Sequence, residues 1–103
     1  MNIKAEVKLV NAKGDLVLDE QLACVLSQVA TGLSLNSAVS ALGYSYSSTW
    51  RKMRAAEISA GAIFIESEGT SASSLTDDGL QVLRVFMEAK RRADGSVEER
   101  QGH

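Results

Sequence analysis

The chain has 103 residues, of which 45% are hydrophobic and 23% are charged, and this length favours a single domain that buries its own core. The net charge of −2 excludes a general polyanion binder. No apolar run approaches the roughly 18 residues of a membrane-spanning helix, and residues 1–10 lack the pattern of a signal peptide, so we expect a cytoplasmic protein without a membrane partner.

Residues 3–10 alternate apolar and polar side chains, which is the pattern of a half-buried strand. The polar segment 11–14 predicts a turn, and residues 16–18 can return as a short second strand. The chain is therefore expected to open with a β-hairpin.

Three helices with capping signals are expected next. Asp19 can cap the first helix, which ends at Gly32, and Ser34 can cap a second, which ends at Gly43. Ser45 can then cap a third helix over residues 45–58. The expected core-facing positions are Leu22, Val25, Leu26 and Val29 in the first helix, Leu35, Ala38, Val39 and Leu42 in the second, and Tyr46, Thr49, Trp50 and Met53 in the third. Two short helices joined by a glycine turn predict a helix-turn-helix.

The segment after the third helix predicts a wing. Residues 62–66 are apolar and β-branched and indicate a strand, residues 69–74 form a polar loop, and Leu75 begins a short return strand. Thr76 is placed to cap a last helix over residues 77–93, whose acidic first turn suits the helix dipole.

The last helix carries more apolar residues than one core-facing stripe requires. It is either deeply buried or also pairs with its twin in a homodimer. Residues 94–103 are charged and nearly free of large apolar side chains, so we expect a domain over residues 1–93 followed by a flexible tail.

The stretch TGLSLNSAVSALGYSYSSTWRKM, together with SLTDDG after the expected wing, resembles the amino-terminal DNA-binding domain of ModE-type molybdate-responsive regulators. More distantly, it is similar to the winged helix-turn-helix of LysR-type regulators. The shared residues are Gly32 and Ser34, Ala38, Leu42-Gly43, Ser45-Tyr46, Trp50, and Leu75-Thr76 with Gly79. The resemblance covers about Ile3 to Lys90 and implies an α+β, mainly helical fold: a winged helix-turn-helix with an amino-terminal β-hairpin and a long carboxy-terminal helix.

Two departures from ModE-type regulators stand out. The wing of that family is usually glycine-rich, whereas here it begins with Glu66 and Glu68, whose carboxylates would face phosphates. The oxyanion-binding domains of full-length ModE regulators have no counterpart in these residues. We therefore expect no molybdate site and no other small-molecule effector site in this chain.

The third helix carries the candidate DNA-binding residues: Ser45, Tyr46, Ser47, Ser48, Arg51, Lys52 and Arg54. With the expected core positions turned inward, Ser48, Arg51, Lys52 and Ala55 point most directly away from the core. We expect base contacts from the serines at 47 and 48 and from Arg51, and phosphate contacts from Lys52 and Arg54. The amides at the helix start offer a further phosphate site. An alternative is that the three cations only form a solvated face.

We expect different roles for the two aromatic residues of this helix, Tyr46 and Trp50. The resemblance implies that the Tyr46 hydroxyl contacts the DNA backbone, and packing with an exposed hydroxyl is the alternative. Trp50 is expected in the core, where Trp50→Ala would lower stability by about 3–5 kcal/mol.

Other chemistry has little support. Cys24 is expected to be a small buried hydrophobe, with a reactive thiol as the alternative, and His103 is the only histidine. No metal-ligand spacing, catalytic triad or phosphate loop is present, so we expect no metal, no cofactor and no enzyme activity.

We expect a sequence-specific transcriptional regulator that binds double-stranded DNA through helix 45–58 and dimerises through helix 77–93. The alternative is a winged-helix protein-interaction module that has lost DNA binding. The net charge of −2 and the five acids without a base in residues 57–78 favour that alternative.

Overall fold

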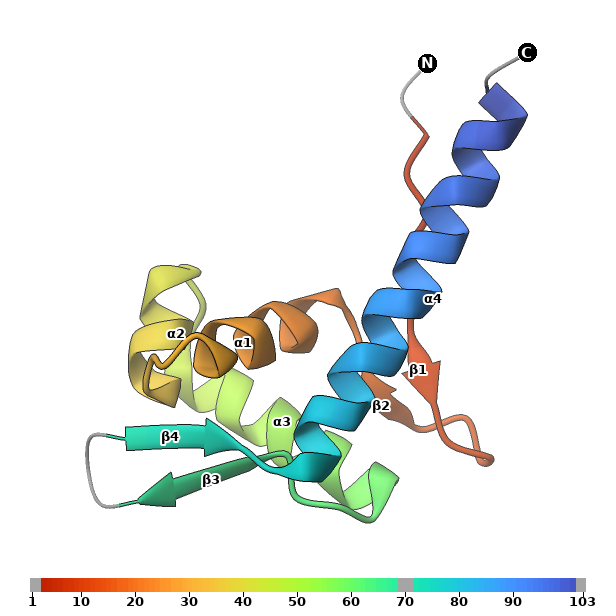
Figure 1. The fold of residues 1–103 in the computed structure, drawn as a ribbon. Helices are drawn as coiled ribbons and strands as arrows, with labels where there is room; N and C mark the ends of the chain where they lie inside the picture. Colours follow the sequence, from red (N-terminus) through yellow and green to blue (C-terminus); the bar gives the residue numbers. More distant parts are fainter. Residues whose placement is uncertain (1–2, 69–71, 102–103) are drawn as a thin grey trace.

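The computed structural model describes residues 3–68 and 72–101, and this part of the chain is an α+β fold that is mainly helical (Figure 1). Its elements in chain order are β1 (Leu9–Val10), β2 (Leu16–Leu18), α1 (Glu20–Ala30), α2 (Leu35–Ala41), α3 (Tyr46–Ala60), β3 (Ile65–Glu68), β4 (Ala72–Leu75) and α4 (Asp77–Gln101). The strands form two separate antiparallel hairpins, β1–β2 and β3–β4. The expected fold class is confirmed at this coarse level.

The opening hairpin forms as predicted but is shorter. Leu9 pairs with Leu18 and Val10 with Leu16, so only the last two residues of the expected strand 3–10 have partners. The turn is held by Asn11, whose side-chain oxygen accepts from the backbone N–H groups of Lys13 and Asp15 at 2.9 and 3.0 Å. The strand is short because β2 offers only three residues to pair with.

The predicted boundaries of α1 and α2 are confirmed. The Asp19 carboxylate accepts from the Leu22 N–H at 3.0 Å, and the Ser34 hydroxyl accepts from the Ser37 N–H at 3.1 Å. Gly32 and Gly43 follow the two helices with φ of 107° and 74°, a conformation that favours glycine. Cap residues with short polar side chains thus fix both helices locally.

The core-facing side of α3 differs from the prediction. Thr49 and Met53 are buried as expected, but Trp50 is 41% exposed and Tyr46 is 46% exposed. The buried stripe continues instead to Ala56 and to Glu57, which is only 4% exposed. The placement of the two aromatic residues in the core is therefore wrong. The buried stripe is centred on Thr49, Met53 and Ala56, and Trp50 lies on its flank, about 60–120° around the helix from these positions.

The second hairpin forms, but its first strand begins later and its second strand begins earlier than predicted. The strand expected over residues 62–66 spans Ile65–Glu68, and Leu75 ends the return strand instead of beginning it. The described part of the expected polar loop 69–74, residues 72–74, belongs to β4. The serines of this strand pair with β3, Ser73 opposite Ser67 and Ser74 opposite Glu66, and the Ser73 hydroxyl also accepts from the Leu35 N–H at 3.2 Å.

The last helix begins as predicted, with the Thr76 hydroxyl accepting from the Gly79 N–H at 2.9 Å. It was expected to end at residue 93 and instead continues to Gln101, beyond the other helices and beside the N-terminal segment (Figure 1). An ion pair one turn apart crosses the predicted end: the Lys90 ammonium lies 3.7 Å from the Asp94 carboxylate.

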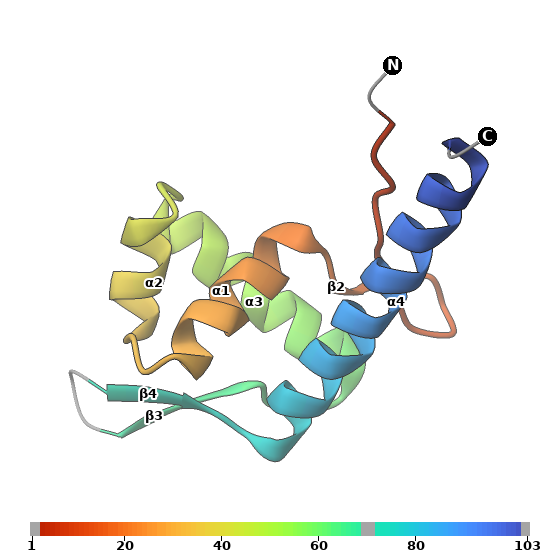
Figure 2. The same ribbon diagram turned by 45° about the horizontal axis from the view of Figure 1, so that its top comes forward.

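The core lies between α1, α2, α3 and β2, and α4 closes it from one side (Figure 2). Its fully buried members include Leu18, Leu22, Val25, Leu26, Val29, Val39, Met53, Phe64 and Phe86. The described part of the chain has no helix with the length and hydropathy to cross a membrane.

Candidate nucleic-acid interface

One face of α3 is open to solvent and carries most of the predicted contact residues. Ser47, Ser48, Arg51 and Ala55 are all exposed, as the sequence predicted. Arg51 has no ion-pair partner among the described side chains, so its guanidinium is available to a ligand. The start of α3 lies after a short connection from α2, and Ser45, at the N-cap position, is also exposed.

The Ser45 side chain occupies the predicted cap position without making the predicted cap bond. Its hydroxyl and the first backbone N–H groups of α3 therefore both remain available at this end of the helix. The side chain of Tyr46, one residue later, is 46% exposed. Together they form a polar, solvent-facing helix start, which is the arrangement that suits an anionic ligand.

Lys52 was expected to point away from the core, and this orientation is wrong. Its side chain is only 33% exposed, and its Nζ lies 2.5 Å from Asp19 Oδ2 and 2.6 Å from Gln21 Oε1. The Asp19 carboxylate caps the start of α1 by accepting from the Leu22 N–H, and its other oxygen pairs with the ammonium group of Lys52. Lys52 thus joins two helices.

Arg54 is exposed but has internal partners. Its guanidinium lies 3.3 Å from the buried carboxylate of Glu57, and its Cζ lies 5.5 Å from the centre of the Trp50 ring. The Glu57 carboxylate also accepts from the backbone N–H of Phe64 at 2.7 Å. A cation that was predicted only as a phosphate contact therefore also orders the side chains around it.

Acidic residues lie beyond α3, in and after the second hairpin. Glu66, Asp77 and Asp78 are exposed and border a shallow surface hollow with Ile63 and Leu75. Their charge means that the basic surface is limited to α3 and does not extend along this hairpin.

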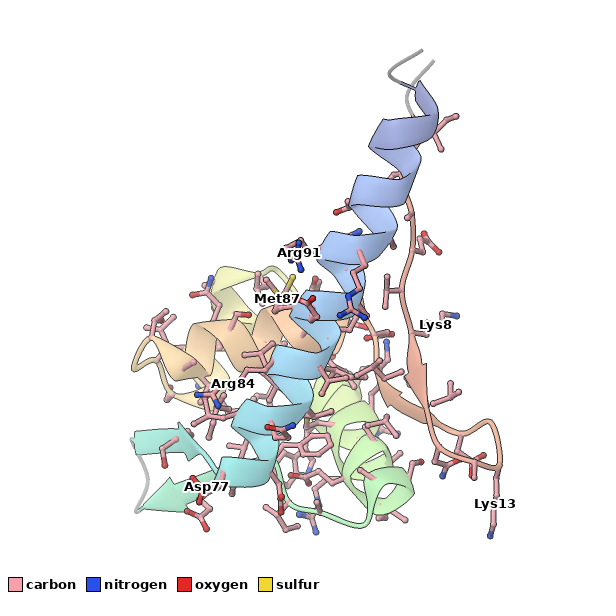
Figure 3. All side chains as sticks on the ribbon, turned by 45° about the vertical axis from the view of Figure 1, so that its right-hand side comes forward. Lys8, Lys13, Asp77, Arg84, Met87 and Arg91 are labelled. Atoms are coloured by element: carbon pink, nitrogen blue, oxygen red, sulfur yellow. The ribbon has the colours of Figure 1, made fainter. Side chains whose placement is uncertain are left out.

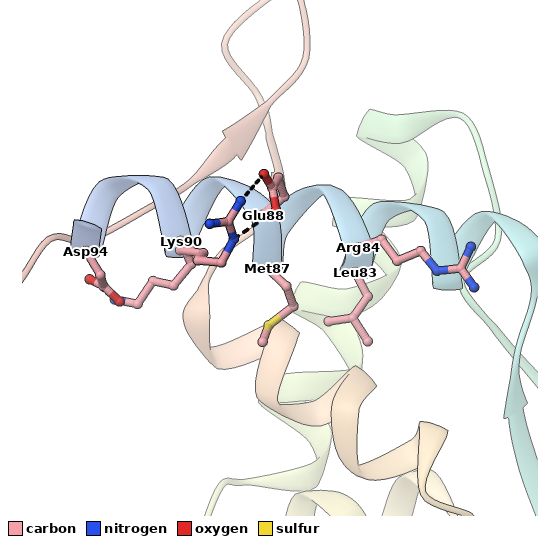
Figure 4. A pocket seen from close by; sticks show the side chains of 7 residues that line it. Leu83, Arg84, Met87, Glu88, Lys90 and Asp94 are labelled. Atoms are coloured by element: carbon pink, nitrogen blue, oxygen red, sulfur yellow. Dashed lines mark hydrogen bonds and ion pairs between the residues drawn. The ribbon is translucent and has the colours of Figure 1, made fainter. Parts of the chain in front are cut away.

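A second surface lies along α4, on the side that faces α1 (Figure 3). An open groove there is lined by Leu83 and Met87 together with the charged side chains of Arg84, Arg91 and Asp94 (Figure 4). Met87 also borders a neighbouring apolar hollow, together with Cys24 of α1 and Leu42. Both hollows are lined mainly by apolar surface.

Cys24 was expected to be buried, and it is exposed. The first helix turns Ala23 and Val25 into the core on either side of it, so the thiol lies at the edge of the buried stripe, beside the α4 groove.

Ion pairs along this groove shift three pKa values. The Arg91 side chain donates hydrogen bonds to Glu88 and lowers the pKa of that carboxyl below its ordinary value of 4.5, and the same contact raises the pKa of Arg91. The hydrogen bond to Glu20, at 3.0 Å, raises the pKa of Lys90 above 10.5, with Asp94 adding to the effect. Glu88, Lys90 and Arg91 are therefore charged near neutral pH.

No protein-family model matches this chain, and no curated protein sequence matches it. Within residues 3–68 and 72–101, no group of histidine, cysteine, aspartate or glutamate side chains is arranged to hold a metal ion.

Trp50 is the surface residue that sequence reasoning missed. The signal was present, because a stripe drawn through Thr49, Met53 and Ala56 has helical spacing and leaves Trp50 on its flank. The large apolar ring made the core placement look preferable.

Proposed function

We propose that this chain is a sequence-specific DNA-binding regulator with a winged helix-turn-helix, in which α3 enters the major groove. The observation that carries the proposal is the exposed face of α3, where Ser47, Ser48 and Arg51 project together and the guanidinium is unpaired among the described residues. A major groove admits one helix, and short polar side chains with an arginine suit its base edges.

The arrangement of the elements supports the same function. The α2 and α3 helices are joined by the four-residue connection 42–45, which fits a helix-turn-helix, and the β3–β4 hairpin follows α3 as a wing does. The resemblance of residues 31–53 and 74–79 to ModE-type regulators is in accord with this arrangement.

Each predicted contact has a role in this proposal. Ser47, Ser48 and Arg51 contact bases, with the arginine gripping a guanine through O6 and N7. Tyr46 and the helix start at Ser45 contact phosphates, and the positions of these side chains at the exposed start of α3 support this role.

The two remaining cations have a more limited role. Arg54 is 50% exposed despite its contact with Glu57 and can reach the backbone of the DNA. Lys52 is held by Asp19 and Gln21, so its phosphate contact requires it to leave these partners.

We further propose a homodimer formed through residues 77–93 of α4. The support is the pair of apolar hollows that meet at Met87, which is 54% exposed, and the charges of both signs along the same groove. A second copy supplies another apolar helix and complementary charges, and two α3 helices about 34–36 Å apart would read a pseudo-palindromic site.

The proposal is tested with duplexes selected from a random pool, measured by fluorescence anisotropy at several salt concentrations. Binding that weakens steeply with salt and prefers the selected duplex over a scrambled one would support it, and the slope counts the phosphates engaged. No binding to any duplex at low salt would overturn it.

A protein-interaction module without DNA binding is the second candidate. The ion pairs of Lys52 with Asp19 and of Arg54 with Glu57 favour it, because they neutralise two of the three cations of α3. Such a module would bind a partner protein and would show no preference between duplexes, so the same titration separates the two functions.

A further inference from the structure

Trp50 is the largest side chain exposed on α3, and it lies next to the proposed DNA-contacting residues of that helix. It follows Thr49, which is buried, and precedes Arg51, which is exposed, so the indole lies on the border between the core and the free face of the helix. On the helix surface it is the neighbour of Ser47, three residues earlier. Any DNA that contacts Ser47 and Arg51 therefore passes beside this ring.

The indole is held in place before any ligand arrives. Arg54 lies over the ring with its Cζ 5.5 Å from the ring centre, and Glu57 holds the Arg54 guanidinium at 3.3 Å. Glu57 is itself fixed, because it accepts from the buried backbone N–H of Phe64 at 2.7 Å. A side chain ordered in this way loses little conformational freedom on binding.

The contact available to such a ring in a major groove is apolar. The base edges there present hydrogen-bond donors and acceptors and one apolar group, the 5-methyl of thymine. Arg54 covers one face of the ring, so the indole is not free on both faces, as insertion between two bases requires. Its exposed part is suited to a side-on contact with a methyl group.

We propose that Trp50 contacts the methyl group of a thymine and so contributes sequence preference at one base pair. This inference rests on the proposed function and adds a residue and a base feature to it. Trp50 acts by direct contact, and Arg54 and Glu57 position it.

The test removes the methyl group alone. In the selected duplex, each thymine is replaced in turn by deoxyuridine, and binding is measured by fluorescence anisotropy. At one position in each half-site we expect binding by the unaltered protein to weaken about fourfold, the loss expected for one buried methyl group. In the Trp50→Ala variant the same exchange should have no effect.

Coupling to the methyl group separates contact from structure. If Trp50 had only a structural role, Trp50→Ala would weaken binding to thymine and uracil duplexes by the same factor. The variant would then still bind the thymine duplex more tightly than the uracil duplex. Trp50 is also the only tryptophan of the chain, so its emission in the unaltered protein reports directly on the contact without any substitution. We expect this emission to change on saturation with the selected duplex.

The proposal is overturned if the unaltered protein binds the selected duplex and no thymine-to-uracil exchange weakens binding in a Trp50-dependent way. It is likewise overturned if saturating duplex leaves the tryptophan emission unchanged. Failure of the proposed function looks different, because no duplex would then bind in the first titration, before any uracil is introduced.

Discussion

Glu57 is a buried carboxylate that joins two elements of the fold. It lies in the last turns of α3, is 4% exposed, and accepts from the Phe64 N–H at 2.7 Å and from the Ile65 N–H at 3.4 Å. These two N–H groups lie where the chain enters β3. The carboxylate thus fixes the second hairpin relative to α3 and orients Arg54 at the same time.

Removing this acceptor should destabilise the protein. We expect Glu57→Ala to lower the free energy of unfolding by about 1–3 kcal/mol, because it leaves a buried N–H without a partner. Glu57→Gln keeps an acceptor oxygen and should cost less. Urea denaturation of both variants checks this, with the exposed Glu66→Gln as a control that should change stability little. Equal losses for Glu57→Ala and Glu57→Gln would contradict the role as acceptor.

Arg51 is the residue on which DNA binding should depend most. Arg51→Ala should lose about 1–3 kcal/mol of affinity for the selected duplex and should discriminate less between bases at one position. Its stability should be unchanged, because the side chain is exposed and makes no ion pair with any described residue.

The control for Arg51 removes an exposed cation elsewhere. Lys8→Ala changes the net charge equally but lies in the segment before β1, away from α3, so it should leave base discrimination intact. If both variants lost the same affinity and kept the same base preference, Arg51 would be contributing general charge and not base recognition.

At the level of the elements, α4 meets the start of β3 at a glycine. A Cβ built on Gly79 would lie 2.3 Å from the carbonyl oxygen of Phe64, which is backbone and cannot move aside easily. Gly95, in the same helix, has open space around the equivalent position. The two glycines therefore differ in what surrounds them and not in the element they belong to.

This difference predicts opposite effects of one substitution. Gly79→Ala should lower the free energy of unfolding by about 1–3 kcal/mol, because the added methyl overpacks a close backbone contact. Gly95→Ala should raise the stability of the helix by about 0.5–1 kcal/mol, since alanine is the better helix former. Thermal and urea denaturation of both variants measure these changes in stability. A Gly79→Ala variant more stable than the unaltered protein would contradict the close contact between Gly79 and the Phe64 carbonyl.

The ion pairs of α4 predict a dependence of stability on pH. The hydrogen bond from Arg91 lowers the pKa of Glu88 below 4.5, so the charged carboxylate stabilises the helix at and above that pH. The contribution should be lost as the pH falls through the lowered pKa. We expect the stability difference between Glu88→Gln and the unaltered protein to be constant above pH 4.5 and to vanish in more acidic solution, as measured by denaturation at each pH. A difference that persisted fully under acidic conditions would contradict this ion pair.

At the scale of the whole molecule, the proposed dimer depends on one face of α4. Met87 and Val85 are both exposed, at 54% and 46%, but lie about 200° apart around the helix. Only Met87 borders the apolar hollows. Comparing a substitution at each position therefore shows whether dimerisation depends on the Met87 face of α4 in particular or on exposed apolar surface in general.

We expect Met87→Glu to be monomeric, because it places a charge in the apolar surface that a second copy would cover. Val85→Glu should dimerise like the unaltered protein. Sedimentation of the three proteins at micromolar concentration checks this. An unaltered protein that is strictly monomeric would exclude the dimer, and equal effects of the two variants would exclude this face.

Much of the fold could be predicted from local signals. Asp19, Ser34 and Thr76 accept the N–H groups that their cap positions predicted, and Gly32 and Gly43 have positive φ at the predicted helix ends. Such signals work because a cap or a turn is settled by a few neighbouring residues. The serines and Arg51 of the candidate site were likewise found from helical spacing alone.

The sequence by itself determined the order of the elements, the helix starts and the local basic face, since these depend on residues within a turn or two of one another. Only the tertiary structure decided which way α3 turned. The core packed against Thr49, Met53 and Ala56 and left Trp50 on the flank of that stripe at the surface, and the Phe64 and Ile65 N–H groups found their acceptor in Glu57. The same packing placed Asp19 beside Lys52 and withdrew that lysine from solvent. Partners that are distant in sequence compete for each face of a helix, and their competition is settled only when the chain is folded.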